Sequence, residues 1–133
     1  MYIPVSREQG ALLYLIVRAI NARRVVEFGS SFGISTIYLT TAVMDNMQSN
    51  PGTFGQVIGS ELEPHKHAVA TQNLEAAGLS DIAKILLGDA MERFQTVEAP
   101  EGLGAAGWLE GALPACREAF KTEAEAGCRR DVG

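Results

Sequence analysis

The sequence predicts an α/β protein built on a Rossmann-like, doubly wound parallel sheet that is incomplete, with about three strands and flanking helices. Short β-rich, buried-strand patterns recur near residues 25, 57 and 82, and helical patterns lie between them. Up to Glu98 there are 22 Val, Ile and Thr residues, whereas the following 35 residues contain only two. Alternating strands and helices are typical of a parallel sheet with right-handed crossovers. We therefore expect a half-domain over 1–98 and an Ala/Gly-rich tail, irregular or helical, over 99–133.

The first helix is predicted to begin after Ser6, a good N-cap, with acidic Glu8 in its first turn. A short buried strand follows over residues 24–28 and ends at Gly29. A second helix then opens near Ile34, out of a glycine-containing turn. The apolar positions that define the first helix are Leu12, Leu13, Ile16, Val17 and Ile20.

The second half of the pattern repeats this order. Residues 50–52 are loop, and residues 56–61 read as the second strand. Pro64 suits the first turn of a helix that Gly78 stops, and residues 82–87 read as the third strand. A short helix is predicted over 113–126 in the tail. A complete six-stranded sheet of this type needs about 180 residues, more than this chain has.

Composition excludes several classes of function. The chain has 133 residues and a formal net charge of −5, opposite in sign to a nucleic-acid-binding surface. Its longest apolar stretch is about half of what a membrane span requires, so no membrane association is expected. Cys116 and Cys128 show no metal-ligand or disulfide spacing. We expect a cytoplasmic protein without a structural metal.

The segment from Glu27 to Ser35 (EFGSSFGIS) lies between the first strand and its helix, where a ligand can meet backbone amides. It is not G-x-G-x-x-G, because the positions two and five after Gly29 are Ser31 and Ile34. It is not a phosphate-binding loop either, because no Gly-Lys-Ser/Thr follows. The glycine spacing weighs against a nicotinamide-dependent oxidoreductase, and the missing Gly-Lys-Ser/Thr weighs against a phosphate-loop nucleotide site.

An acidic residue two positions before the first glycine suits a cationic ligand better than a pyrophosphate. S-adenosylmethionine has this chemistry, since Glu27 could meet its amine or sulfonium and the helix start near Ser35 could hold its carboxylate. Glu61, at the end of the second strand, can accept hydrogen bonds from a ribose diol. Gly88-Asp89-Ala90, after the third strand, offers a carboxylate and backbone groups to the adenine edge. Three strand ends thus present three suitable groups.

Four segments together resemble class I S-adenosylmethionine-dependent methyltransferases, and most closely the bacterial and catechol O-methyltransferase family. These segments are SREQG at 6–10, VVEFGSSFGIST at 25–36, SELEP at 60–64 and GDA at 88–90, and the similarity covers residues 6 to about 96. The resemblance implies a Rossmann-like fold and S-adenosylmethionine as cofactor. It implies a small-molecule acceptor with a hydroxyl group, if the chain is active.

Carried over by position, Glu27 and Gly29 would line the methionine moiety, Ser35 its carboxylate, Glu61 the ribose and Asp89 the adenine. The predicted cofactor set is completed by Ser30, Ser31, Gly33 and Ala90.

The resemblance also implies a divalent metal such as Mg²⁺, with an Asp ligand and a Lys base in a hydrophobic-Asp-x-Trp-Lys context after the fourth strand. No such segment is present, so we assign no catalytic or metal-binding residue and expect a truncated, weakly active or inactive methyltransferase.

The missing segment can be read in a displaced frame of the tail. Shifted by one base, the codons implied by residues 107–111 permit D-G-W-K, which matches the absent Asp and Lys context. We therefore consider a one-base shift between about codons 98 and 102, with a merely divergent terminus as the alternative.

Two further expectations concern function and assembly. A non-catalytic nucleoside-binding or interaction module on the same half-fold is the alternative to an enzyme. Without a fourth strand, the apolar first strand would be an exposed edge, which predicts self-association.

Overall fold

The computed structural model describes residues 5–93. The elements follow one another in the predicted order. They are α1 (Arg7–Ala19), β1 (Arg24–Phe28), α2 (Ile34–Ser49), β2 (Gln56–Glu61), α3 (Pro64–Ala76), β3 (Ala83–Leu87) and the short α4 (Ala90–Arg93). The predicted strands are confirmed within one residue at each end. The tail over 99–133, with the helix predicted there, lies outside the described residues.

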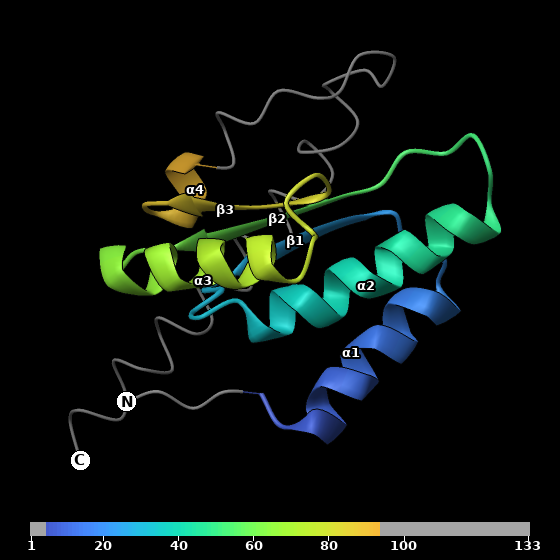
Figure 1. The fold of residues 1–133 in the computed structure, drawn as a ribbon, viewed down its shortest axis with the longest axis horizontal. Coiled ribbons are helices and arrows are strands. Elements are labelled where there is room, and N and C mark those ends of the chain that lie inside the picture. The colour runs from blue at the N-terminus through green and yellow to red at the C-terminus, as the bar shows by residue number, and fades with distance from the viewer. Residues whose placement is uncertain (1–4, 94–133) are drawn as a thin grey trace. The chain divides into compact units, whose positions relative to one another are not determined.

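The three strands form one parallel sheet in the order β1-β2-β3 (Figure 1). Val25 pairs in register with Val57, which pairs in turn with Ala83. This arrangement confirms the prediction of an incomplete Rossmann-like sheet. Within residues 5–93, β1 and β3 are both edge strands, because each pairs only with β2.

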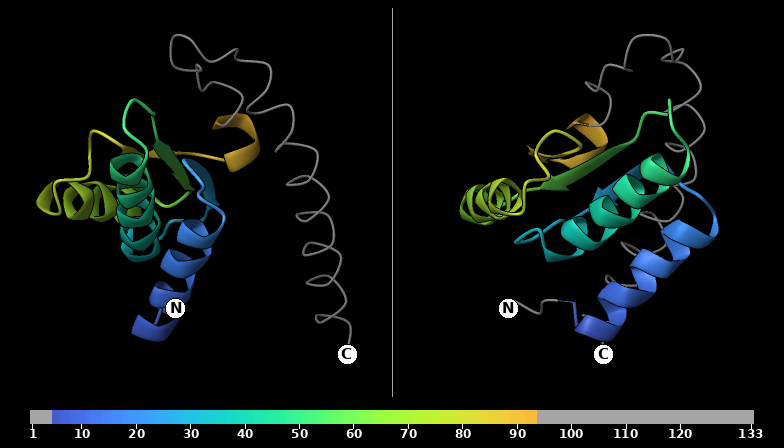
Figure 2. Two further views of the ribbon diagram at one scale, coloured as in Figure 1. Left: turned by 90° about the vertical axis from the view of Figure 1, so that its right-hand side faces the viewer. Right: turned by 45° about the vertical axis from the view of Figure 1, so that its right-hand side comes forward.

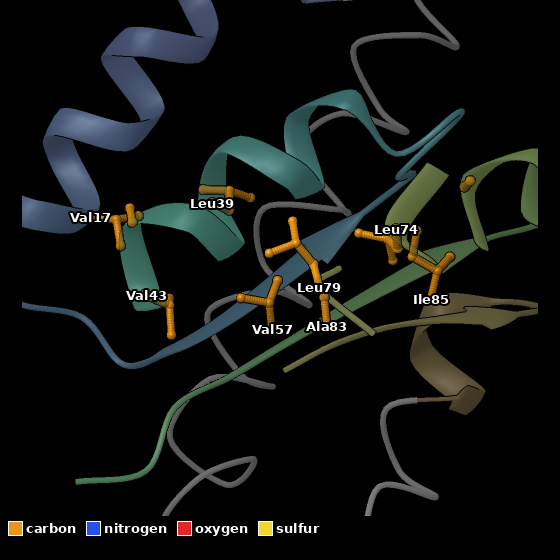
Figure 3. Close-up of a cluster of buried hydrophobic side chains, with 10 residues drawn as sticks. Val17, Leu39, Val43, Val57, Leu74, Leu79, Ala83 and Ile85 are labelled. Atoms are coloured by element: carbon orange, nitrogen blue, oxygen red, sulfur yellow. The ribbon is translucent and has the colours of Figure 1, made fainter. Parts of the chain in front are cut away.

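The hydrophobic core lies between one face of this sheet and the helices α2 and α3 (Figure 3). Val57, Ala83 and Ile85 supply the sheet side of the core, since alternate residues of a strand share a face. Burial of this apolar surface is the main stabilising contribution, at about 25 cal/mol per Å² removed from water. The helices contribute Val17, Leu39, Ala42, Val43, Ala70 and Leu74, and Leu79 follows α3.

Helix α1 begins with a capping box. The Ser6 hydroxyl accepts a hydrogen bond from the Gln9 backbone N–H at 3.1 Å, and the Gln9 side chain accepts one from the Ser6 N–H at 2.9 Å. The helix packs along α2 (Figure 2). The buried Asn46 side chain joins the two elements, because its amide donates to the carbonyls of Val17 (3.1 Å) and Ala22 (2.7 Å).

The other face of α1 carries an exposed apolar stripe. Leu12, Leu15, Ile16 and Ile20 are 57%, 60%, 48% and 70% exposed, and their spacing places them on one side of the helix. A helix that is apolar on opposite faces is usually covered on both. We call these four residues the α1 stripe.

Among residues 5–93, no helix is both long and apolar enough to cross a bilayer.

Candidate functional site

The turn between β1 and α2 follows an unusual backbone path. Gly29, Ser31 and Gly33 all have positive φ, at +70°, +51° and +84°. Glycine adopts this region without penalty, whereas a side chain there costs about 1–2 kcal/mol. Nothing lies within 4 Å of a Cβ placed on Gly29, so that glycine is required by conformation alone. At Gly33 space is tight as well, because a Cβ would lie 3.2 Å from Ala70 Cβ and one of the two would have to shift by a few tenths of an ångström.

Ser30 fastens this turn to the sheet. Its backbone N–H donates to the Ser60 carbonyl at 2.8 Å, and its side chain is 2% exposed. The Ser30 hydroxyl lies directly over Gly59, so closely that a Cβ at position 59 would collide with it. Among residues 5–93 this hydroxyl has no hydrogen-bond partner. The Ser30 side chain is thus turned toward Gly59 of β2, and its role toward a ligand stays a prediction.

Glu27 meets the first turn of α2 directly. Ser35 Oγ donates to Glu27 Oε2 and Thr36 Oγ1 donates to Glu27 Oε1, each at 2.5 Å. The N-cap of α2 is Gly33, which has no side chain to cap the helix. The Ser35 and Thr36 hydroxyls donate to the Glu27 carboxylate and do not cap the helix end. The structure therefore brings together two of the predicted residues, Glu27 and Ser35.

Glu61 joins the ends of the first two strands. Its Oε2 accepts from the Ser31 backbone N–H at 2.7 Å, and its Oε1 accepts from the Glu63 N–H at 3.0 Å. The side chain is only 9% exposed. Each carboxylate oxygen can accept about two hydrogen bonds, so each retains capacity for one more donor.

The third strand end is tied to the second. The Gly88 N–H donates to the Glu61 carbonyl at 2.9 Å, which fixes the start of the Gly88-Asp89-Ala90 segment beside β2. Asp89 is exposed and Ala90 is buried. The predicted convergence of the strand ends is therefore seen in the backbone, while the roles of Asp89 and Ala90 toward a ligand stay predictions.

Helix α3 also holds the turn. Asn73 Nδ2 donates to the Phe32 carbonyl at 2.8 Å. The Phe32 ring meets the His65 ring edge-on at 6.4 Å, and Lys66 Nζ lies 6.0 Å from its centroid. The turn is thus connected both to β2 and to α3.

Glu63 acts as the N-cap of α3. Its carboxylate accepts from the N–H groups of His65 (3.0 Å) and Lys66 (2.8 Å), and these bonds lower the pKa of Glu63. The sequence indicates that Glu63 is a solvated charge at the start of this helix, and the structure adds that its side chain caps the helix.

Thr36 belongs to the candidate site through its contact with Glu27, but the sequence does not single it out. It lies inside the motif that carried the resemblance, yet nothing in the sequence distinguished its hydroxyl from that of a core threonine. Its contact with Glu27 depends on how the first turn of α2 meets β1, which no local sequence pattern reveals.

In the part of the chain that is described, no group of three His, Cys, Asp or Glu side chains comes together to hold a metal ion. The described residues do not fit the Mg²⁺ site that the resemblance implies, and we derive no step through a metal.

The chain is similar in sequence to known O-methyltransferases. A family model described as O-methyltransferase matches residues 1–104. The chain is 37% identical over 95 residues to a catechol O-methyltransferase of Mycobacterium tuberculosis, covering 71% of this chain and 40% of that protein. It is 35% identical over 103 residues to a catechol O-methyltransferase of Niastella koreensis, covering 77% and 42%. The chain thus spans less than half the length of these relatives.

Solved structures show the same fold. One is the O-methyltransferase TomG of Streptomyces achromogenes, which is involved in tomaymycin synthesis and was solved with S-adenosylmethionine (SAM). It has a TM-score of 0.62 and 31% identity, over 74% of this chain and 40% of that one. The Bacillus cereus O-methyltransferase, solved with S-adenosylhomocysteine (SAH), has a TM-score of 0.62 and 27% identity, over 72% and 41%.

Proposed function

This chain belongs to the O-methyltransferase family, and we propose that its residues 5–93 form the cofactor-binding part of an S-adenosylmethionine-dependent O-methyltransferase. The observation that carries the proposal is the pair of acidic residues at adjacent strand ends. Glu27 is held by two hydroxyls, and Glu61 by two backbone amides. The relatives solved with S-adenosylmethionine and S-adenosylhomocysteine support this assignment.

The described residues fit this cofactor. Glu27 is half-buried and retains lone pairs beside its two hydroxyl donors, so it would meet the cationic amine of the methionine moiety. Glu61 would accept from the ribose diol through the capacity left on its oxygens. Ser35 would turn to the cofactor carboxylate, and Asp89 and Ala90 would meet the adenine.

Bound S-adenosylmethionine would supply a methyl group on a sulfonium for transfer to a hydroxyl oxygen. We propose a small-molecule acceptor, because the relatives include catechol O-methyltransferases. The described residues would bind and orient the cofactor, and the deprotonation of an acceptor is not assigned to any of them.

Isothermal titration tests the cofactor assignment. We expect S-adenosylhomocysteine to bind with 1:1 stoichiometry and NAD not to bind. Ligand at 100 times its Kd should stabilise the fold by about 2.7 kcal/mol. Binding of NAD alone, or of neither compound, contradicts the proposal. The variant Glu27→Gln should weaken S-adenosylhomocysteine, whereas Glu75→Gln, an exposed glutamate on α3, should not.

A non-catalytic nucleoside-binding module is the second candidate. The groups of the candidate site within residues 5–93 suit binding of a nucleoside, and none of them is assigned the deprotonation of an acceptor. Methyl transfer from labelled S-adenosylmethionine to catechol, in a preparation shown to bind the cofactor, separates the two candidates. Turnover supports the enzyme, and binding without turnover supports the module.

We further propose that copies of this chain associate through the β1 edge. The side of β1 facing away from β2 has no strand paired to it within residues 5–93, and such an edge can pair with a second copy. The α1 stripe adds four exposed apolar side chains that carry no charge, so two copies would not repel each other there.

We also propose a cytoplasmic location, because the two cysteines show no disulfide spacing.

A further inference from the structure

Two hydroxyls hold Glu27, and they differ in accessibility. Ser35 is half-buried, whereas Thr36 is 0% exposed. The two donors occupy different oxygens of the carboxylate, Oε2 and Oε1. A ligand can therefore reach the Ser35 hydroxyl but cannot reach that of Thr36.

This difference has a consequence for the proposed cofactor site. If Ser35 turns to the carboxylate of the methionine moiety, Glu27 loses its donor at Oε2. The donor at Oε1 remains, because the Thr36 hydroxyl is enclosed and has Glu27 as its acceptor. A carboxylate with one fixed donor keeps its orientation, and its second oxygen then points to the ligand amine.

We infer that Thr36 is a positioning residue that keeps the Glu27 carboxylate directed at the cofactor amine while Ser35 binds the cofactor carboxylate. This inference rests on the proposed function. Thr36 touches no ligand itself, and its effect passes entirely through Glu27.

The backbone around Thr36 supports a fixed role. The carbonyl of Thr36 accepts from Thr40 Oγ1 at 2.6 Å, one turn further along α2. Thr40 is likewise 0% exposed, but its hydroxyl reaches only the helix backbone and not Glu27. Thr40 is therefore a matched control: a buried threonine on the same helix, without a contact to the carboxylate.

The test uses two ligands that share a nucleoside. S-adenosylhomocysteine carries the amine and the carboxylate of the amino-acid moiety, and 5′-methylthioadenosine lacks both. Thr36→Val removes the hydroxyl with little change in shape, and Thr36→Ser keeps it. We expect Thr36→Val to weaken S-adenosylhomocysteine about tenfold or more and to leave 5′-methylthioadenosine within about twofold. Thr36→Ser should bind both ligands nearly as the parent does.

Two comparisons separate positioning from a general loss of structure. Thr40→Val should lower Tm without changing the ratio of the two Kd values. In the background of Glu27→Gln, Thr36→Val should weaken S-adenosylhomocysteine by much less than tenfold, because the residue through which it acts has been changed. If Thr36→Val does not fold, Thr36→Ala provides the same comparison.

The outcomes are distinguishable. Equal weakening of both ligands by Thr36→Val, no weakening of either, or full additivity with Glu27→Gln would overturn the role of Thr36 and leave the proposed function intact. If the parent protein binds neither ligand, the proposed function fails, and the inference about Thr36 fails with it.

Discussion

Glu61, the last residue of β2, accepts a hydrogen bond at 2.7 Å from the backbone N–H of Ser31, in the turn that follows β1. Ser31 is the one non-glycine residue of that turn with a positive φ. A side chain in this region is unfavourable by about 1–2 kcal/mol. The hydrogen bond that the Ser31 N–H donates to Glu61 offsets this cost and holds the turn in its conformation. One carboxylate thus fixes the shape of the turn and remains available to a ribose.

Replacing Glu61 by Gln should lower both stability and affinity. The N–H groups of Ser31 and Glu63 bond to different oxygens of Glu61, and in the amide one of these two positions is an NH₂ group, so one N–H would face a donor and lose its acceptor. We expect a loss of about 2 kcal/mol in the free energy of unfolding, measured by urea denaturation, together with weaker S-adenosylhomocysteine binding. Glu75→Gln serves as the control. Unchanged stability in the Glu61 variant would contradict this account.

The close approach of Ser30 to Gly59 predicts a compensating pair. Gly59→Ala places a methyl group where the Ser30 hydroxyl lies, and overpacking of this kind costs about 1–3 kcal/mol. Ser30→Ala removes a buried hydroxyl that lacks a partner, so alone it should be neutral or stabilising. The double variant should recover part of the loss, because the collision with the hydroxyl is gone while the Cβ of residue 30 and Ile85 Cγ1 would still lie 3.3 Å from the new methyl group. Additive effects in thermal unfolding would show that the two positions do not compete for space.

The strand pattern was predictable because buried parallel strands are rich in β-branched residues, and these are local features of the sequence. The placement of Glu27 and Glu61 at one edge of the sheet was predictable, because the carboxyl ends of neighbouring parallel strands share that edge. The inward turn of Ser30 and the contact of Thr36 with Glu27 were not, because both depend on how α2 approaches the sheet. The contact of His67 Nε2 with the Ile85 carbonyl, at 2.8 Å, likewise depends on how α3 packs on β3.

The cap of α3 predicts a pH dependence of stability. The N–H groups of His65 and Lys66 lower the pKa of Glu63 below its usual value of 4.5. A lowered folded-state pKa means that the contribution is present above pH 4.5 and is lost as the pH falls through the folded-state pKa. The difference in Tm between the parent protein and Glu63→Gln should be largest near neutral pH and should shrink in acid.

The parent protein and Glu75→Gln provide the reference for this titration. Glu75 is exposed and caps no helix, so its variant should follow the parent protein at every pH. A Tm difference for Glu63→Gln that stays constant from neutral pH into acid would be evidence against the cap.

The α1 stripe predicts which substitutions reduce self-association. Leu15→Lys and Ile20→Lys introduce charges at two strongly exposed apolar positions, where no loss of core packing is expected. We expect the weight-average mass in sedimentation at high concentration to fall toward that of the monomer. Leu62→Lys is the control, since Leu62 is 69% exposed but lies outside α1. A parent protein that is already monomeric, or an equal effect of the control, would refute the association proposal.

The coding DNA tests the hypothesis of a displaced frame in the tail, whose residues lie outside the described range. The family model matches up to residue 104, close to the position at which the composition changes.

Trp108 is encoded only by TGG. In the frame displaced by one base, the last two bases of this codon start the second triplet of D-G-W-K, which encodes glycine whichever codon Leu109 uses. The other three depend on codon choice: Asp requires GGA at Gly107, Trp requires a Leu109 codon ending in G, and Lys requires GAA at Glu110. We therefore expect GGA-TGG-(C/T)TG-GAA at codons 107–110. Any other third base at codon 107 or 109 removes the Asp or the Trp, and the tail is then a divergent sequence rather than a shifted one.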